Sequence, residues 1–367
     1  MARKLKSDRM LFFTTIALAF SGLVMVYSAS NMLTSQGGSQ SGVALIKQIL
    51  FIVFGLAAMA AAMKVNYHAY RLPTVIWALL GVTIIALVAV LIIGPKINNT
   101  RRWIRLAGIS LQPSEFAKIA MVVFAAAVLE QRMARIKELR YALGPIAAAL
   151  AVVFALVVFE PDFGSGVAIV LVVAIMIFAA GIPIRYLLMI AAGAVPVLAG
   201  VAILEPYRIT RFLIFLHPER DPQGKGFQIL QSLIAVGTGG VTGRGLGQSI
   251  QKMSYLPYAQ SDFIYAVTAE ELGLVGVTLM LVCFAILTWR GLRVAARAPD
   301  AYGSLLALGL TALIGVQAFM NISIVLGLLP TKGIPLPFIS AGGSSLIVSL
   351  IATGVLLNIS QQASAEG

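Results

Sequence analysis

Long apolar runs recur along this 367-residue chain, and no other feature restricts its possible folds as strongly. Most of the runs approach the roughly 20 residues that an α-helix needs to cross the hydrocarbon core of a bilayer. The composition agrees, because only 11% of the residues are charged, whereas soluble domains carry about 25%. The chain is therefore predicted to be an all-α integral membrane protein, with one polytopic membrane domain over residues 1–367.

About ten transmembrane helices are predicted from the apolar periodicity. They cover residues 11–30, 44–63, 73–94, 113–130, 142–159, 167–181, 184–204, 262–288, 303–329 and 344–360. The first run follows a basic start, as in a signal peptide. It is too long for the apolar core of such a peptide and has no clear cleavage site, so it is interpreted as a retained span.

The distribution of Lys and Arg orients the bundle. With the N-terminus inside, the basic residues of the short connections concentrate on the cytoplasmic side. Both termini are then cytoplasmic, and the one long connection, 205–261, is extracytoplasmic between spans 7 and 8. The net charge of +13 is explained by the membrane rather than by nucleic-acid binding. Within the long loop, FQILQSLIAVG predicts an amphipathic helix and TGRGLGQS a turn.

Five segments with unusual polar residues fall on the outer side of this topology. They are NTRRWIRLAG (99–108), LQPSEFAK (111–118), EPDFGSG (160–166), the long loop, and LPTKGIPLPFISAGGSS (329–345). Random placement would divide such segments between the two sides of the membrane. We therefore expect them to form a functional site on the outer side.

Several side chains in these segments have two interpretations. Glu115 and Lys118 share a helix face, so they form either a buried ion pair or a site where the lysine meets an anionic ligand. Asp162 is expected to cap the next span, which is compatible with ligand contact. Trp103 is either an interfacial anchor or, with Arg102 beside it, a contact to a sugar or phosphate.

Three acids stand at the start of the eighth span. Asp262 is expected at the helix N-cap, at the water interface, where a negative charge suits the helix dipole. Glu270 and Glu271 follow about 12 Å deeper and are interpreted as structural groups tied to polar partners inside the bundle. No cluster of Asp, Glu and His has metal-ligand spacing, so no metal site is assigned.

Together these motifs resemble the SEDS family (shape, elongation, division and sporulation), which polymerises peptidoglycan. RRWI, QPSEFAK, EPDFGSG, QGKGFQILQSLIAVGTGG, SDFIYAVTAEELG and LPTKGIPLPFISAGGSS match in order and spacing over most of the chain. The sequences of these motifs resemble the cell-division member of the family more closely than the elongation member. The chain departs from the usual family pattern at Tyr258, Gln260 and Ala341, where the family has Glu, His and Tyr.

The resemblance implies a glycosyltransferase that uses lipid II, with the glycan growing on undecaprenyl pyrophosphate as the donor. The 4-hydroxyl of GlcNAc would attack C1 of MurNAc with inversion and release undecaprenyl pyrophosphate. The family's essential aspartate corresponds to Asp262, which would act as the catalytic base. The side chains expected to contact the pyrophosphate or sugar are Lys118, Arg102, Trp103, Asp162, Arg208, Arg244 and Ser344. A Mg²⁺ or Mn²⁺ ion on the pyrophosphate would need few protein ligands.

The resemblance also implies a place and partners. The expected location is the bacterial inner membrane at the division septum, with the site facing outward. The expected partners are a class B penicillin-binding protein with transpeptidase activity and other divisome proteins. Three alternatives stay open: an elongation polymerase, a lipid II flippase that would not need Asp262 as a base, and a scaffold that only recruits the transpeptidase.

Overall fold

A computed structural model gives the structure of the protein. It describes residues 7–30, 40–96, 100–106, 109–135, 138–183, 185, 186, 188, 192, 200, 214–224, 226–252, 256, 257, 259–331 and 333–363. Over these residues the fold is helical apart from one two-stranded hairpin. The all-α prediction is thereby confirmed.

Long helices make up most of the described chain. They are α1 Arg9–Ser30, α2 Gln40–Lys64, α3 Pro73–Ile93, α4 Pro113–Arg132, α5 Leu139–Phe159, α6 Phe163–Ala179, α9 Phe227–Thr238, α10 Ile264–Arg297, α11 Ala301–Val325 and α12 Gly343–Ala363. Short 3-10 turns lie at Tyr67–Arg71, Met133–Arg135 and Pro218–Arg220, and the hairpin consists of β1 Ile104–Leu106 and β2 Ile109–Leu111.

Six described helices are long and apolar enough to cross a membrane, and three shorter apolar helices accompany them. The protein is therefore a multi-pass membrane protein. Nine predicted spans coincide with helices in the described ranges. The tenth, 184–204, lies mostly outside the described residues. The amphipathic helix predicted inside the long loop is α9.

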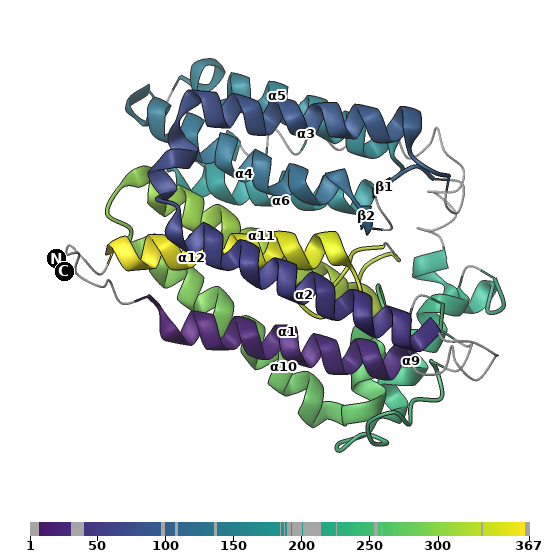
Figure 1. Cartoon of the computed structure of the whole chain (residues 1–367). Coiled ribbons are helices and arrows are strands. Elements are labelled where there is room, and N and C mark those ends of the chain that lie inside the picture. Colours follow the sequence, from purple (N-terminus) through teal and green to yellow (C-terminus); the bar gives the residue numbers. More distant parts are fainter. Residues whose placement is uncertain are drawn as a thin grey trace.

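The helices form one bundle in which α4 and α12 are central (Figure 1). Helix α12 packs along α2, α11 lies between α10 and α6, and α3 covers α4. Both chain ends lie at one end of the bundle, whereas the hairpin and α9 lie at the opposite end (Figure 1). This arrangement agrees with a topology in which both termini are on the same side of the membrane.

The prediction of one continuous helical span over 262–288 is wrong. Gly273 interrupts α10 with φ 63° and ψ −163°, and after this break the helix continues to Arg297. A positive φ is accessible to glycine because it lacks a Cβ atom. The apolar run therefore contains two helical pieces rather than one.

The long loop folds back onto this break. Backbone N–H groups of Arg244 and Gly245 donate to the carbonyls of Glu270 and Glu271, at 3.0 and 2.9 Å. In return, residues 274 and 275 donate to the carbonyls of residues 240 and 241. Backbone groups that a continuous helix would pair internally are thus paired with the loop, as buried backbone groups require.

Candidate functional site

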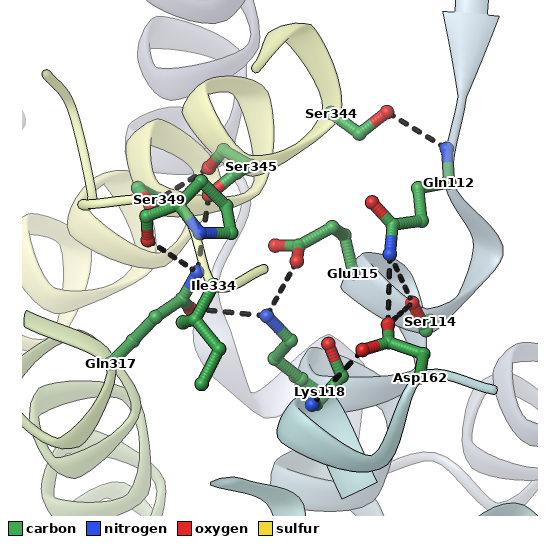
Figure 2. A network of polar contacts seen from close by, with 12 residues as sticks. Gln112, Ser114, Glu115, Lys118, Asp162, Gln317, Ile334, Ser344, Ser345 and Ser349 are labelled. Carbon is green, nitrogen blue, oxygen red and sulfur yellow. Dashed lines mark hydrogen bonds and ion pairs between the residues drawn. The ribbon is translucent and has the colours of Figure 1, made fainter. Parts of the chain in front are cut away.

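The five polar segments meet at the end of the bundle opposite the termini. The backbone N–H of Gln112 donates to Ser344 Oγ at 2.9 Å, and its side chain donates to Asp162 at 2.9 Å (Figure 2). Ser340 Oγ of the last segment donates to the carbonyl of Ser261 at the end of the long loop. These contacts join four of the five segments, in agreement with the expected convergence.

The β1–β2 hairpin connects the end of α3 to the start of α4. The guanidinium of Arg102 donates to the carbonyls of Glu160 and Pro161, where α5 ends. Such carbonyls have no partner within their own helix, and a basic side chain satisfies them. Arg102 therefore joins the hairpin to the turn that carries Asp162, and Trp103 beside it is half-buried.

Lys118 and Glu115 form a buried ion pair on the first turns of α4. Lys118 Nζ lies 2.6 Å from Glu115 Oε1, and both side chains are 1% exposed. A second acceptor, Gln317 Oε1 on α11, lies 3.2 Å from the same nitrogen (Figure 2). The ion-pair interpretation describes this arrangement. An ammonium group has three donors, and the described residues supply acceptors for two of them.

Asp162 caps α6, as the sequence predicted. Its carboxylate accepts the backbone N–H of Ser165 at 3.3 Å. It also accepts from Ser114 Oγ at 3.0 Å and from Gln112 Nε2 at 2.9 Å (Figure 2). Three donors satisfy the hydrogen-bonding capacity of this buried carboxylate. This acid therefore links α6 to the start of α4.

Glu160, two residues earlier, was not identified from the sequence. Its side chain is fully buried in the turn between α5 and α6. Neither carboxyl oxygen has a hydrogen-bond partner among the described residues. Burial, and then the charge of Asp162, raise the pKa of Glu160 to about 9, against the opposing effect of Arg102. Glu160 is therefore protonated at neutral pH.

Asp262 lies in the turn just before α10. The helix begins at Ile264 with Phe263 at the N-cap, so the expectation that Asp262 is the N-cap is wrong. The carbonyls of residues 260 and 261 accept hydrogen bonds from the last polar segment, and these hold the chain in a turn up to this point. The half-buried carboxylate faces Gly333, where a Cβ atom would come within 3.0 Å of Asp262 Oδ2.

Glu270 is held by the long loop. Ser249 Oγ donates to Glu270 at 2.5 Å, the N–H of Ile250 donates at 3.0 Å, and Arg244 Nη1 lies 3.6 Å away. The predicted structural role agrees with these contacts. Its partners, however, come from the loop rather than from inside the bundle, because the loop reaches down to the break in α10.

Glu271 forms a second buried ion pair. Lys252 Nζ of the long loop lies 2.7 Å away, and both side chains are almost completely buried. Ser28 Oγ on α1 also donates to Glu271, at 2.6 Å. No sequence signal indicated Ser28 or Lys252 as partners, because both are distant from Glu271 in sequence.

The remaining predicted site residues divide into two groups. Ser344 Oγ accepts the backbone N–H of Gln112 and so joins α12 to the start of α4. Arg208 and Tyr258 lie outside the described residues.

Two other departures from the family pattern are neighbours, because Ala341 N–H donates to the carbonyl of Gln260 at 2.9 Å. Among the described residues, no group of three or more His, Cys, Asp or Glu side chains could hold a metal ion.

Comparisons of the sequence identify relatives over nearly the whole chain. The model of the cell cycle protein family that groups FtsW, RodA and SpoVE matches residues 8–365. Stage V sporulation protein E of Bacillus subtilis is 41% identical over 363 residues, which are 98% of each chain. The probable peptidoglycan glycosyltransferase FtsW of Geobacter sulfurreducens is 42% identical over 353 residues, covering 96% of this chain and 95% of that protein.

Solved structures have the same fold. A chain from a study of how a peptidoglycan synthase complex coordinates polymerization and crosslinking superimposes with a TM-score of 0.80. It is 30% identical, and the match covers 98% of this chain and 99% of that one. The rod shape determining protein RodA of Thermus thermophilus gives a TM-score of 0.71 at 26% identity, with 98% of each chain covered.

Proposed function

The chain belongs to the FtsW, RodA and SpoVE family of cell cycle proteins, and we propose that this peptidoglycan glycosyltransferase polymerises lipid II with Asp262 as its catalytic base. The observation that carries the proposal is the position of Asp262. Its half-buried carboxylate lies where the long loop meets the last polar segment, against a glycine that leaves it uncrowded. This junction is at the end of the bundle where the other polar segments also converge.

The chemistry assigned to Asp262 is proton removal. In the proposed reaction the 4-hydroxyl of GlcNAc attacks C1 of a lipid-linked MurNAc, and undecaprenyl pyrophosphate leaves. The hydroxyl loses its proton as the new C–O bond forms, and a carboxylate within hydrogen-bond reach can accept that proton. Inversion at C1 needs no second carboxylate as a nucleophile.

The leaving pyrophosphate needs positive charge as it departs. Lys118 is suited to this role, because one of its three donors remains for a ligand after Glu115 and Gln317 are satisfied among the described residues. Arg102 carries a second positive charge beside the turn that holds Asp162, and its guanidinium is a group that binds phosphate. Asp162, Ser344 and Arg244 have protein partners, and we assign them the task of holding the polar segments together.

The relatives support a biological setting for this activity. Curated relatives named FtsW support a role in septal synthesis during cell division. A synthase complex that couples polymerization to crosslinking has this fold, which supports a transpeptidase of the class B penicillin-binding type as the partner. We place the site on the outer face of the bacterial inner membrane, with both termini in the cytoplasm.

The test is polymerisation of labelled lipid II by the purified chain in complex with its transpeptidase. Wild type, Asp262→Asn and a matched control, Asp300→Asn, are compared by gel analysis of the glycan. Asp300 caps the start of α11, beyond the far end of α10 from Asp262, and Asn caps helices as well as Asp does. Polymer is expected from wild type and Asp300→Asn but not from a folded Asp262→Asn.

Two results would contradict parts of this proposal. Polymer from Asp262→Asn at the wild-type rate would leave a polymerase whose base is another group. No polymer from the wild-type complex would remove the lipid II polymerase proposal. A lipid-flipping assay with the same three proteins would then test the transport alternative.

A further inference from the structure

Three consecutive backbone carbonyls, ending with that of the proposed catalytic acid, each accept a hydrogen bond. The carbonyl of Gln260 accepts the N–H of Ala341 at 2.9 Å. The carbonyl of Ser261 accepts Ser340 Oγ at 2.5 Å, and that of Asp262 accepts Asn321 Nδ2 at 2.9 Å. The backbone that carries Asp262 is therefore fixed at every residue of this turn.

Asn321 differs from the other two donors because it binds two segments at once. It lies on α11 and is 1% exposed. Its second N–H donates to the carbonyl of Ile334 at 2.7 Å. That residue follows Gly333, whose Cα faces the Asp262 carboxylate. One amide nitrogen thus sets the distance between the catalytic turn and the segment that the carboxylate faces.

The side-chain oxygen of Asn321 indicates which of the residue's polar groups is important. Its Oδ1 is buried and has no hydrogen-bond partner among the described residues. Leaving a buried acceptor unpaired destabilises a fold. An apolar side chain of similar size would avoid this penalty. The double donation from Nδ2 is therefore the interaction that the position supplies.

The same face of α11 reaches the buried ion pair. Gln317, one turn before Asn321, accepts from Lys118 and donates to Ser345 Oγ at 3.2 Å. It also donates to the carbonyl of Pro335 at 3.3 Å. Consecutive residues of the last polar segment, Ile334 and Pro335, are thus held by the two amides. Helix α11 provides a common frame for Asp262 and for the proposed phosphate-binding lysine.

We propose that Asn321 is a positioning residue for the glycosyl transfer, which fixes the Asp262 backbone relative to the segment around Gly333. This inference rests on the proposed function of Asp262. Asn321 itself contacts only main-chain carbonyls and not the reacting atoms. A displacement of about 1 Å in a catalytic group can lower a rate by about 100-fold. Loss of both hydrogen bonds is therefore expected to affect turnover more than substrate affinity.

The experiment compares kcat and KM for lipid II polymerisation in the complex with the transpeptidase. The variants are Asn321→Leu, which removes both donors, and Asn321→Asp, which keeps the shape and turns acceptors toward the two carbonyls. Asn358→Leu is the matched control. Asn358 is also a buried helical asparagine, near the C-terminal end of α12, and it donates to the carbonyl of Met63. Asp262→Asn is measured in parallel, with Tm for every variant.

We expect kcat to fall 10- to 100-fold in both Asn321 variants, with KM within about twofold of wild type. Asn358→Leu should lower Tm at least as much and retain its kcat, because a merely structural loss would not change turnover selectively. The inactive Asp262→Asn complex shows the loss of activity expected when the proposed base is removed. If Asn321→Leu fails to fold, the isosteric Asn321→Asp carries the test.

Three outcomes would overturn the inference. Wild-type kcat in a folded Asn321 variant, beside an inactive Asp262→Asn, would refute positioning while the proposed function stands. An equal loss of kcat in Asn358→Leu would show that general destabilisation explains the effect. Full activity in Asp262→Asn would refute the proposed role of Asp262, and the positioning role of Asn321 with it.

Discussion

Glu160 provides the sharpest test of the electrostatics at this end of the bundle. Its carboxyl group is fully buried, and neither oxygen has a partner in the described ranges. Substitution Glu160→Gln replaces a protonated acid by a neutral amide of the same size. We expect the variant to polymerise lipid II as wild type does, and to be more stable than wild type at alkaline pH.

The sign of the effect follows from the pKa of Glu160 in the two states. Folding raises it from the ordinary value of 4.5 to about 9. Between these values the folded protein keeps a proton that the unfolded chain releases, so the free energy of unfolding falls as pH rises. The stability associated with this proton is fully present below pH 4.5 and is lost as pH rises toward 9.

The size of the effect follows from the same shift. One pH unit within the window changes the free energy of unfolding by about 1.4 kcal/mol. Raising the pH by about two units from near neutrality should therefore destabilise wild type by on the order of 2–3 kcal/mol through this group. Glu160→Gln has no proton to lose, so this part of the pH dependence disappears.

The assay is thermal unfolding in detergent between about pH 6.5 and pH 8.5, a window in which this linkage applies. The difference in Tm between Glu160→Gln and wild type should grow with pH. Asp162→Asn is the control from the same turn, because its carboxylate accepts three hydrogen bonds and an amide cannot accept them all. It should lower Tm at every pH. Parallel Tm curves for Glu160→Gln and wild type would refute a neutral, buried Glu160.

Three further predictions concern the long loop, the break in α10 and the last polar segment. Lys252→Met leaves Glu271 buried without its cation and should destabilise the protein by about 3–5 kcal/mol. Adding Glu271→Gln should restore part of the lost Tm, and no recovery would contradict the importance of the ion pair. Gly273→Ala places a Cβ at φ 63° and should destabilise the protein by about 1–3 kcal/mol. The control Gly81→Ala has open space around it and should leave the Tm unchanged. Equal Tm values for the two variants would argue against the break in α10. Gly333→Ala crowds the proposed catalytic carboxylate and should reduce polymerisation several-fold at nearly unchanged Tm, so wild-type turnover would contradict the assigned geometry.

The helices could be predicted because their signals are local. Apolar length located nine spans to within a few residues at most of their ends. The Asp162 cap was predictable because Asp is a preferred N-cap residue, and Pro161 before it and Gly164 after it indicate an interruption between two helices. The pairing of Glu115 with Lys118 was one of two interpretations, since a spacing of three places both on one helix face.

Long-range pairings could not be predicted. The pairing of Glu271 with Ser28 and Lys252, and the two carbonyls that Asn321 binds, join segments far apart in the chain. The break at Gly273 was missed because a single glycine in an apolar run also fits an ordinary helix. Glu160 was not identified because its buried carboxyl group lacks hydrogen-bond partners among the described residues, and a local sequence pattern does not indicate this.

The interrupted helix also has a consequence for biosynthesis. The backbone groups of residues 270–275 pair with residues 240–245, which the ribosome makes first. With the orientation proposed above, the loop must therefore be exported before the first part of α10 has a place to fold. Until then, unpaired amides in an apolar segment would oppose its entry into lipid. With that orientation, assembly of the turn that carries Asp262 is a late event in membrane insertion, and it depends on successful export of the loop.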